Sequence, residues 1–221
     1  MFSNIRKACV TILIVGCVSS SWATDFTGSL LTGYKAGLGL TMSCMASDFA
    51  VGFPLSFEFT LGYTSRDPGN AEQARGIFIN DNTNGTPENK GYMWDMQFDF
   101  LYRVKALGIK ESYLYVGVRR SMFTANFRYV GGNEDFDVTT NQWGIGAGVK
   151  ASFPMGNKVS FVLKTGVDNY FASMLYGHDT SYSPSGEVLN GKHSFTYRDA
   201  DAVINHPKFQ FAGLVGVSYS F

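Results

Sequence analysis

The side chains best placed to do chemistry are charged residues that recur at every second position along otherwise alternating runs of the chain. They carry both signs and are Glu58, Asp95, Asp99 and Asp168 against Arg103, Lys150, Lys164 and one of Arg119 or Arg120. Facing one narrow enclosed space, such a set could line an ion path with a charged constriction. The alternative is a purely structural role as a paired, hydrogen-bonded polar core, because a buried charge is tolerated only when it is paired. We expect the paired core.

Three histidines raise the possibility of hydrolytic chemistry. His178, His193 and His206 all fall in the last long polar segment, 177–207, and His178-Asp179 and His193-Ser194 are adjacent pairs. A nucleophile, a base and an orienting carboxylate are recognised by their geometry and not by adjacency in the sequence. We therefore expect loop histidines without a catalytic role, and no enzyme.

The segment 80–85 (NDNTNG) resembles the start of a calcium loop. The twelfth position of such a loop is Gly91, where a bidentate glutamate is needed. An Asn- and Gly-rich surface turn is the better interpretation, and we expect no metal and no cofactor. Cys44 is interpreted as a small apolar strand residue.

The elements that must position the charged residues are strands with a period of two residues. In 209–221 (FQFAGLVGVSYSF) large apolar residues at odd positions alternate with small or polar ones. The same alternation runs through 51–63, 92–104, 142–153 and 159–171. In 112–129 the pair Arg119-Arg120 interrupts it, and a β-bulge there would restore the pattern. The segment 26–45 is one long strand or two short strands joined near 34–37.

Segment lengths choose between these two counts. The long polar segments are 65–90, 131–141 and 177–207, and the short ones are 106–111 and 154–158. In barrels of the bacterial outer membrane long loops lie outside and short turns lie on the periplasmic side. Dividing 26–45 gives eight strands with every long loop on the same side, so we predict an all-β, closed antiparallel up-and-down barrel of eight strands.

Residue size indicates which face of the barrel is outside. An eight-stranded interior is only just wide enough for side chains. Glycine, serine and balanced charges fit this space, whereas rows of Phe, Trp and Tyr do not, and a large apolar wall in water would aggregate. The large face is therefore expected to contact lipid as a transmembrane barrel. Aromatic residues near strand ends suit the two interfacial girdles: Tyr63, Tyr92, Trp94, Tyr102, Tyr113, Trp143, Phe153 and Tyr219.

The first residues have the pattern of an export signal. Arg6-Lys7, the apolar stretch 8–18 and Ser21-Trp22-Ala23 predict a cleavable signal peptide at 1–23 and a single barrel domain at 24–221. A rival interpretation takes Ile14-Val15-Gly16-Cys17 as a lipoprotein signal. The formal net charge of +0 argues against nucleic acid as a partner.

These features together resemble the small bacterial outer-membrane β-barrels of the OmpA/OmpX type. The terminal Tyr219-Ser220-Phe221 is similar to the aromatic end that, in that family, the barrel-assembly machinery reads; Val215, Val217, Tyr219 and Phe221 would form this assembly signal. The resemblance implies outer-membrane lipid and lipopolysaccharide as surroundings, and a structural or surface-interaction role for the loops, with the surface partner unknown. A narrow, porin-like pore for ions or small solutes and a lipid A-modifying enzyme are the alternatives.

Overall fold

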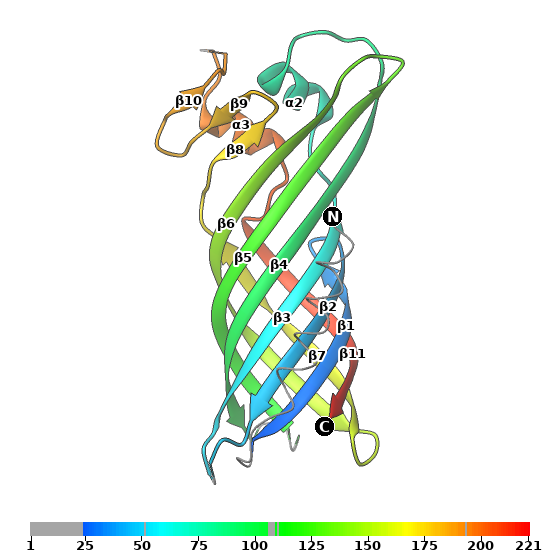
Figure 1. Ribbon diagram of the computed structural model, residues 1–221, viewed down its shortest axis with the longest axis vertical. Helices are drawn as coiled ribbons and strands as arrows, with labels where there is room; N and C mark the ends of the chain where they lie inside the picture. Colours follow the sequence, from blue (N-terminus) through cyan, green and yellow to red (C-terminus); the bar gives the residue numbers. More distant parts are fainter. Residues whose placement is uncertain (1–23, 51, 106–108, 110, 193) are drawn as a thin grey trace, which may run out of the picture.

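Eight antiparallel strands close into a barrel in the computed structural model, which describes residues 24–50, 52–105, 109, 111–192 and 194–221. Each barrel strand pairs with the next along the chain, and the last pairs with the first (Figure 1). The strands are β1 (Asp25–Lys35), β2 (Leu38–Ser47), β3 (Leu55–Arg66), β4 (Thr86–Val104), β5 (Glu111–Val130), β6 (Asp135–Pro154), β7 (Val159–Tyr170) and β11 (Phe209–Ser220). The expected signal peptide, 1–23, lies outside the described residues.

The segment 26–45, which the sequence allowed to be one long strand or two short ones, divides into β1 and β2. This confirms the count of eight strands. A two-residue turn at Ala36 and Gly37 joins them, and both residues have positive φ, 53° and 152°. Gly37 packs so closely against the backbone of Ser65 that a Cβ would overlap its carbonyl oxygen. Glycine is therefore required at this turn.

The large apolar residues face outward, as predicted. Along β3 the inward Ser56, Glu58 and Thr60 are buried at 1–3% exposure. On the outer wall, Phe98 of β4 and Ile145 of β6 are 42% and 53% exposed, on either side of Val118 in the strand register. A period of two residues thus gives the barrel a polar interior and an apolar exterior.

The predicted bulge at Arg119-Arg120 is wrong, because β5 pairs without interruption with both β4 and β6. Arg119 points inward and is 1% exposed. Arg120 points outward, and its guanidinium carbon lies 5.0 Å from the ring centroid of Trp143. A long aliphatic stem and a cation–π contact let arginine occupy an otherwise apolar face.

Several predicted strand limits also need correction. β3 begins at Leu55 and not at 51, since Gly52 has a φ of +76° and Pro54 has no N–H to donate to a ladder; Val51 itself lies outside the described residues. The predicted loop 131–141 is wrong, because β6 already begins at Asp135 and continues the hairpin with β5.

The extra lengths of β4, β5 and β6 form a three-stranded extension, here called the blade: 86–90, 121–130 and 135–143. It continues past the ends of β3 and β7 (Figure 1). At 3.3–3.4 Å per residue, the nine residues of β6 in the blade add roughly 30 Å along the strand. This extension gives the long connections a wall to pack against.

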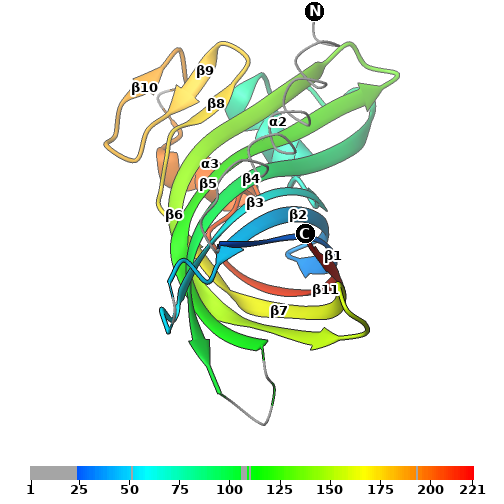
Figure 2. The same ribbon diagram turned by 60° about the horizontal axis from the view of Figure 1, so that its bottom comes forward.

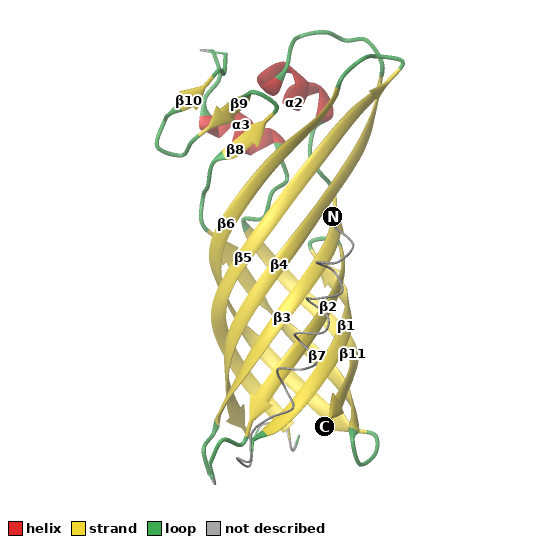
Figure 3. Cartoon of the chain, viewed as in Figure 1, coloured by secondary structure: helices red, strands yellow, loops and turns green. Residues whose placement is uncertain are grey.

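Two long connections fold into a compact layer, here called the loop cap, which lies beside the blade and next to β6 (Figures 2 and 3). Its elements are α2 (Ala71–Phe78), β8 (Leu175–Gly177), β9 (Thr180–Tyr182), β10 (Val188–Leu189) and α3 (Tyr197–Val203). β8 pairs with Val138 and Thr139, so the small sheet extends the barrel sheet. Neither helix of the described chain is long and apolar enough to span a membrane.

Candidate functional sites in the lumen and the loop cap

The barrel interior holds a set of buried ion pairs, here called the lumen network. Lys164 lies at its centre, with Nζ 2.6 Å from Oε1 of Glu58 and 3.0 Å from Oδ2 of Asp99. Lys150 also pairs with Glu58. Arg119 pairs with Asp99 through Nη1 at 2.5 Å. The network residues are Lys35, Glu58, Asp95, Asp99, Arg119, Lys150, Lys164 and Asp168, four cations and four anions.

The network continues toward the loop cap through Asp168. Asp168 accepts a hydrogen bond from Nε of Arg119 at 2.6 Å and one from Nε2 of Gln210 at 3.4 Å. Gln210 in turn accepts from Nη1 of Arg66, the last residue of β3, at 3.1 Å. A polar chain therefore runs from the centre of the barrel to its rim on the loop side.

A separate ion pair in the lumen contains Lys35, which sequence reasoning missed. Its Nζ lies 2.6 Å from Oδ2 of Asp95, and the same oxygen accepts from Nε2 of Gln97 at 2.7 Å. Lys35 precedes the β1–β2 turn, and the apolar inward Leu31 obscures the alternation of β1. Once the turn is fixed at Ala36-Gly37, counting in steps of two from Leu31 places Lys35 inside.

Arg103 is the one predicted network residue that the structure places elsewhere. Its Nη2 pairs with Oδ2 of Asp48 at 2.9 Å, and both side chains are 40% exposed at the turn end of the barrel. The structure does place the other six predicted residues inside the barrel, where all are buried: Glu58, Asp95, Asp99, Lys150, Lys164 and Asp168. Tyr113, predicted for a girdle, is also misplaced: it is 2% exposed and points into the lumen, 5.7 Å from the Arg103 guanidinium.

Apolar side chains fill the interior space beside the ion pairs. Met45, Leu101, Tyr113 and Tyr115 form one inward cluster, and Nζ of Lys164 lies 4.7 Å from the ring centroid of Tyr115. A second cluster contains Leu31, Val162 and Leu214. The interior of an eight-stranded barrel is only just wide enough for side chains, and these residues occupy it together with the ion pairs.

The loop cap has a hydrophobic core of its own. Phe78 of α2 is 3% exposed and meets Tyr182 of β9 edge to face, with ring centroids 5.5 Å apart. Asn70 caps α2 by accepting a hydrogen bond from the Gln73 N–H. Residues of β4, β5, β6 and the two long connections form one cluster: Ala71, Ala74, Ile77, Phe78, Met93, Phe123, Ala125, Phe127, Tyr129, Phe136, Val138, Leu175, Tyr182, Ala200, Val203 and Ile204.

Polar contacts fix α2 to the blade and to β9. Tyr182 donates through its hydroxyl to the Ile77 carbonyl at 3.1 Å, which satisfies a carbonyl at the helix end. Arg75 is 1% exposed, pairs with Glu134 at 2.5 Å and lies 4.2 Å from the ring centroid of Tyr129. The cap is therefore a packed module, in contrast to the flexible loops that a polar sequence suggests.

His206 joins the cap to the barrel. Its Nε2 lies 2.8 Å from Oδ1 of Asp201 on α3, and its Nδ1 lies 3.3 Å from Oε1 of Gln142 on β6. Lys208 also binds Asp201, at 2.8 Å. The hydrogen bond from His206, helped by Lys208, lowers the pKa of Asp201 to about 2. Because both ring nitrogens are engaged, His206 has no free nitrogen to activate a nucleophile.

The described residues among the other histidines and in the Asn-rich segment form neither a catalytic group nor a metal site. His178 pairs only with its exposed neighbour Asp179, at 3.0 Å, and His193 lies outside the described residues. Asn80 and Asn82 accept hydrogen bonds from the backbone two residues on, as in Asx turns. In the described part of the chain no group of three or more His, Cys, Asp or Glu residues could hold a metal ion.

The residues proposed as an assembly signal share the outer face of β11. Val215, Val217 and Tyr219 are 44–47% exposed, and Phe221 beyond the strand is 74% exposed. Tyr219 and Phe221 meet edge to face at 5.3 Å. The geometry places them together as one apolar stripe.

The fold and interior define the class of structure: a small closed β-barrel with an apolar outer wall and a packed polar lumen. The chain is similar to a major outer membrane protein from Thermus thermophilus, at 24% identity and a TM-score of 0.73, over 90% of this chain and 100% of that one. It also matches Neisserial surface protein A, at 13% identity and a TM-score of 0.36, over 90% and 96%. The first likeness shows the fold. No protein-family model and no curated protein matches the sequence.

Proposed function

We propose that this protein is an integral outer-membrane barrel with a sealed lumen, whose role is structural or lies in surface contacts made by the loop cap. The observation that carries the proposal is the packed cap on the blade, because a module with its own core presents a fixed surface. Function belongs to sites carried on folds, and here the built surface lies beyond the barrel wall.

The outer wall supports a membrane position. The row Phe98, Val118 and Ile145 is entirely apolar, and nearer the blade tip the paired Asn126 and Asp137 are polar. Between these rows lie Arg120 and Trp143 in cation–π contact. Tryptophan with a snorkelling arginine is typical of the membrane–water interface. The blade tip would thus stand in water beyond an apolar band.

The sequence resemblance supplies the orientation and the partners. The long connections would lie on the outside, within the lipopolysaccharide leaflet and above it, and the turns 48–54 and 154–158 would face the periplasm. Residues 1–23 would direct export. The exposed stripe Val215, Val217, Tyr219 and Phe221 would be read by the barrel-assembly machinery.

The pore and enzyme alternatives receive less support. A pore requires a water-filled path, whereas the side chains of Lys164, Arg119 and their carboxylate partners are at most 6% exposed and paired across the lumen. A lipid-modifying enzyme requires a free base beside a nucleophile, and His206 has both ring nitrogens engaged. We therefore propose a protein without enzymatic activity.

A labelling experiment on intact cells tests the proposed orientation. Glu187→Cys places a thiol in an exposed cap turn, and Asn157→Cys places one in the exposed turn between β6 and β7. A membrane-impermeant maleimide should label Glu187→Cys in intact cells and label Asn157→Cys only after the cells are opened. The unsubstituted chain gives the background from Cys44.

Two results would contradict the proposal. Labelling of Asn157→Cys in intact cells together with protection of Glu187→Cys would reverse the orientation. Equal labelling of both sites only after lysis would remove the cap from the cell surface and end its proposed surface role.

A further inference from the structure

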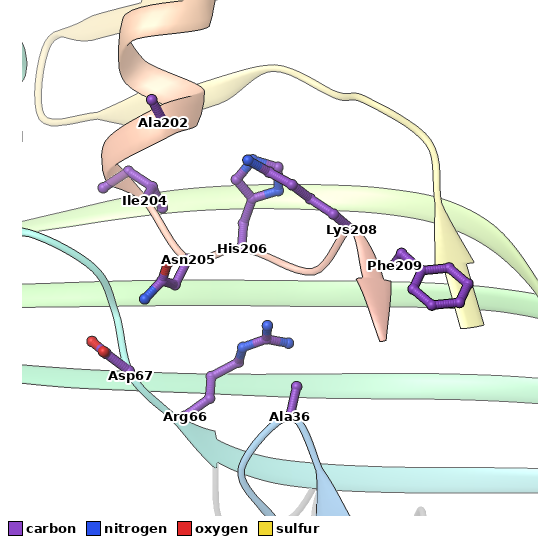
Figure 4. A pocket seen from close by; sticks show the side chains of 9 residues that line it. All are labelled: Ala36, Arg66, Asp67, Ala202, Ile204, Asn205, His206, Lys208 and Phe209. Carbon is purple, nitrogen blue, oxygen red and sulfur yellow. The ribbon is translucent and has the colours of Figure 1, made fainter. Parts of the chain in front are cut away.

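A cavity of about 260 Å³ lies where the barrel rim meets the loop cap. Its walls come from the β1–β2 turn, the end of β3 and the connection from α3 to β11 (Figure 4). Four nitrogen-bearing side chains line it: the amide of Asn205 and the cationic or titratable Arg66, His206 and Lys208. Sites for drug-sized ligands occupy ~300–1,000 Å³, so this cavity suits a single small polar group.

Arg66 is a cation without an anionic partner among the described residues. Its Nη1 donates to Oε1 of Gln210 at 3.1 Å and lies 3.9 Å from Sδ of Met93. Its Nε is buried and makes no hydrogen bond. A guanidinium offers five N–H donors in a fork that matches carboxylate or phosphate. Every cation of the lumen network has such a partner, so Arg66 differs from them.

The other two cationic or titratable groups, His206 and Lys208, are already oriented by a carboxylate. Asp201 holds Nε2 of His206 and Nζ of Lys208, each at 2.8 Å. The remaining carboxylate, Asp67, lies at the cavity wall, and its Oδ1 accepts the Gly69 N–H at 2.9 Å. Figure 4 shows the Arg66 guanidinium extending toward His206, away from Asp67. The side of the cavity toward Lys208 is therefore the one suited to an anion.

Apolar residues flank this cavity on the outer wall. Phe209, which lines the cavity, is 70% exposed, and Tyr34, two residues before the lining residue Ala36, is 60% exposed. Both face outward on neighbouring strands, β11 and β1. An amphiphile could lay its chains on these rings and direct its polar head into the cavity.

We propose that this cavity binds a phosphate monoester group through Arg66 and Lys208, and that the group belongs to a lipid headgroup of the surrounding leaflet. The lipid source depends on the proposed membrane position, whereas phosphate binding does not. His206 forms the back of the site and holds α3 beside it. A bound anion would pair the Arg66 guanidinium and link the cap to the barrel rim.

The test uses the full chain refolded in octyl glucoside micelles, with barrel closure checked by its migration in unboiled SDS samples. Three probes are titrated: dihexanoyl phosphatidic acid, inorganic phosphate and the neutral dihexanoylglycerol. Calorimetry gives the affinity, and the ¹⁵N–¹H resonance of Arg66 Nε reports the contact directly. We expect phosphatidic acid to bind and shift this resonance, and dihexanoylglycerol to leave it unchanged.

Matched variants identify the residue. Arg66→Gln should weaken binding of phosphatidic acid about tenfold or more, since a hydrogen bond to a charged group is lost. Lys208→Gln should weaken it less, and because Lys208 is half exposed this variant should fold if Arg66→Gln does not. Arg128→Gln, an exposed change on the blade away from the cavity, should bind as the unsubstituted chain does.

Each outcome decides one part. Binding of neither phosphate probe would overturn the site, and so would binding by both Arg66→Gln and Lys208→Gln as tight as that of the unsubstituted chain. Inorganic phosphate binding as tightly as phosphatidic acid would keep the phosphate site and overturn its lipid source. Because the micelle measurement needs only a closed barrel, phosphate binding would stand even if the protein proved absent from the outer membrane.

Discussion

Arg119 and Asp168 meet across Gly146 of the intervening strand β6, with Nε of Arg119 2.6 Å from Oδ1 of Asp168. The two side chains cover the glycine so closely that a Cβ at position 146 would overlap both charged groups. The glycine is therefore what allows β5 and β7 to be linked inside the lumen. Its presence fits the small inner face that the sequence predicts for β6.

Gly146→Ala should destabilise the barrel by ~1–3 kcal/mol, the usual cost of inserting a methyl group into a packed interior. The added methyl must displace an ion pair that is also coupled to Asp99. Urea unfolding in lipid vesicles measures this loss. Gly156→Ala, where a Cβ meets nothing within 4 Å, is the control and should leave the midpoint unchanged. Equal midpoints for both variants would argue against a tightly packed lumen.

Phe78→Ala should loosen the loop cap while the barrel stays closed. Removing a buried aromatic ring costs ~3–5 kcal/mol, and here the loss falls on a core separate from the ion pairs. Limited proteolysis should therefore cut the cap connections faster, with unchanged migration of the unboiled barrel. Leu189→Ala, at a residue 61% exposed, should have little effect. Unfolding of the whole barrel by Phe78→Ala would instead make the cap and barrel one cooperative unit.

Acid should loosen the junction between α3 and the barrel. The pKa of Asp201 is lowered from 3.8 to about 2 in the folded chain by hydrogen bonds from His206 and Lys208. A carboxylate with a depressed pKa adds stability that is complete above about pH 4 and is lost as the pH falls toward 2. Hydrogen exchange of the α3 amides, corrected for intrinsic rates, should show lost protection across this range.

Asp201→Asn is the matched variant for this pH dependence. Its α3 amides should be less protected at pH 5 and change less on acidification. A residual change is expected from Asp199, whose pKa is lowered by hydrogen bonds from Thr196 in the capping box. An identical pH dependence in Asp201→Asn would show that Asp201 does not anchor α3.

The purified barrel should form no ion-conducting pore in planar bilayers. Lys164 and Arg119 link carboxylates from β3, β4 and β7 across the interior. Current recording at high salt is the measurement, with a known porin as the positive control. Reproducible single-channel steps whose amplitude changes in Asp99→Ala would favour the narrow pore instead.

The sequence predicted the barrel and its outward face because a period-two pattern survives in most of the strands, and the lengths of the polar segments settled the strand count. It failed where polar residues continue a strand beyond the apolar band. Asp135 and Asp137 resemble a loop in composition but belong to β6, where they pair with Arg128 and Asn126 of β5. Their inward neighbours, Phe127 and Phe136, pack on the loop cap, and only tertiary structure shows that contact.

The charged set was predicted by alternation, and the pairing within it was not. Six of the seven residues are buried inside the barrel. Arg103 lies at the exposed turn end of β4 and pairs with Asp48. Lys35 and Arg66 escaped notice because both end their strands, where a pattern of two residues has too few neighbours to be read. The junction of Asp201 and His206 depends on how α3 packs and has no local signal.

The most direct test of the account is cell fractionation combined with heat-modifiability of the protein extracted from membranes. The account predicts that the protein is found in the outer-membrane fraction and migrates faster in SDS when unboiled, because a closed barrel of this kind resists SDS until it is heated. A soluble periplasmic pool with identical migration before and after boiling would contradict it.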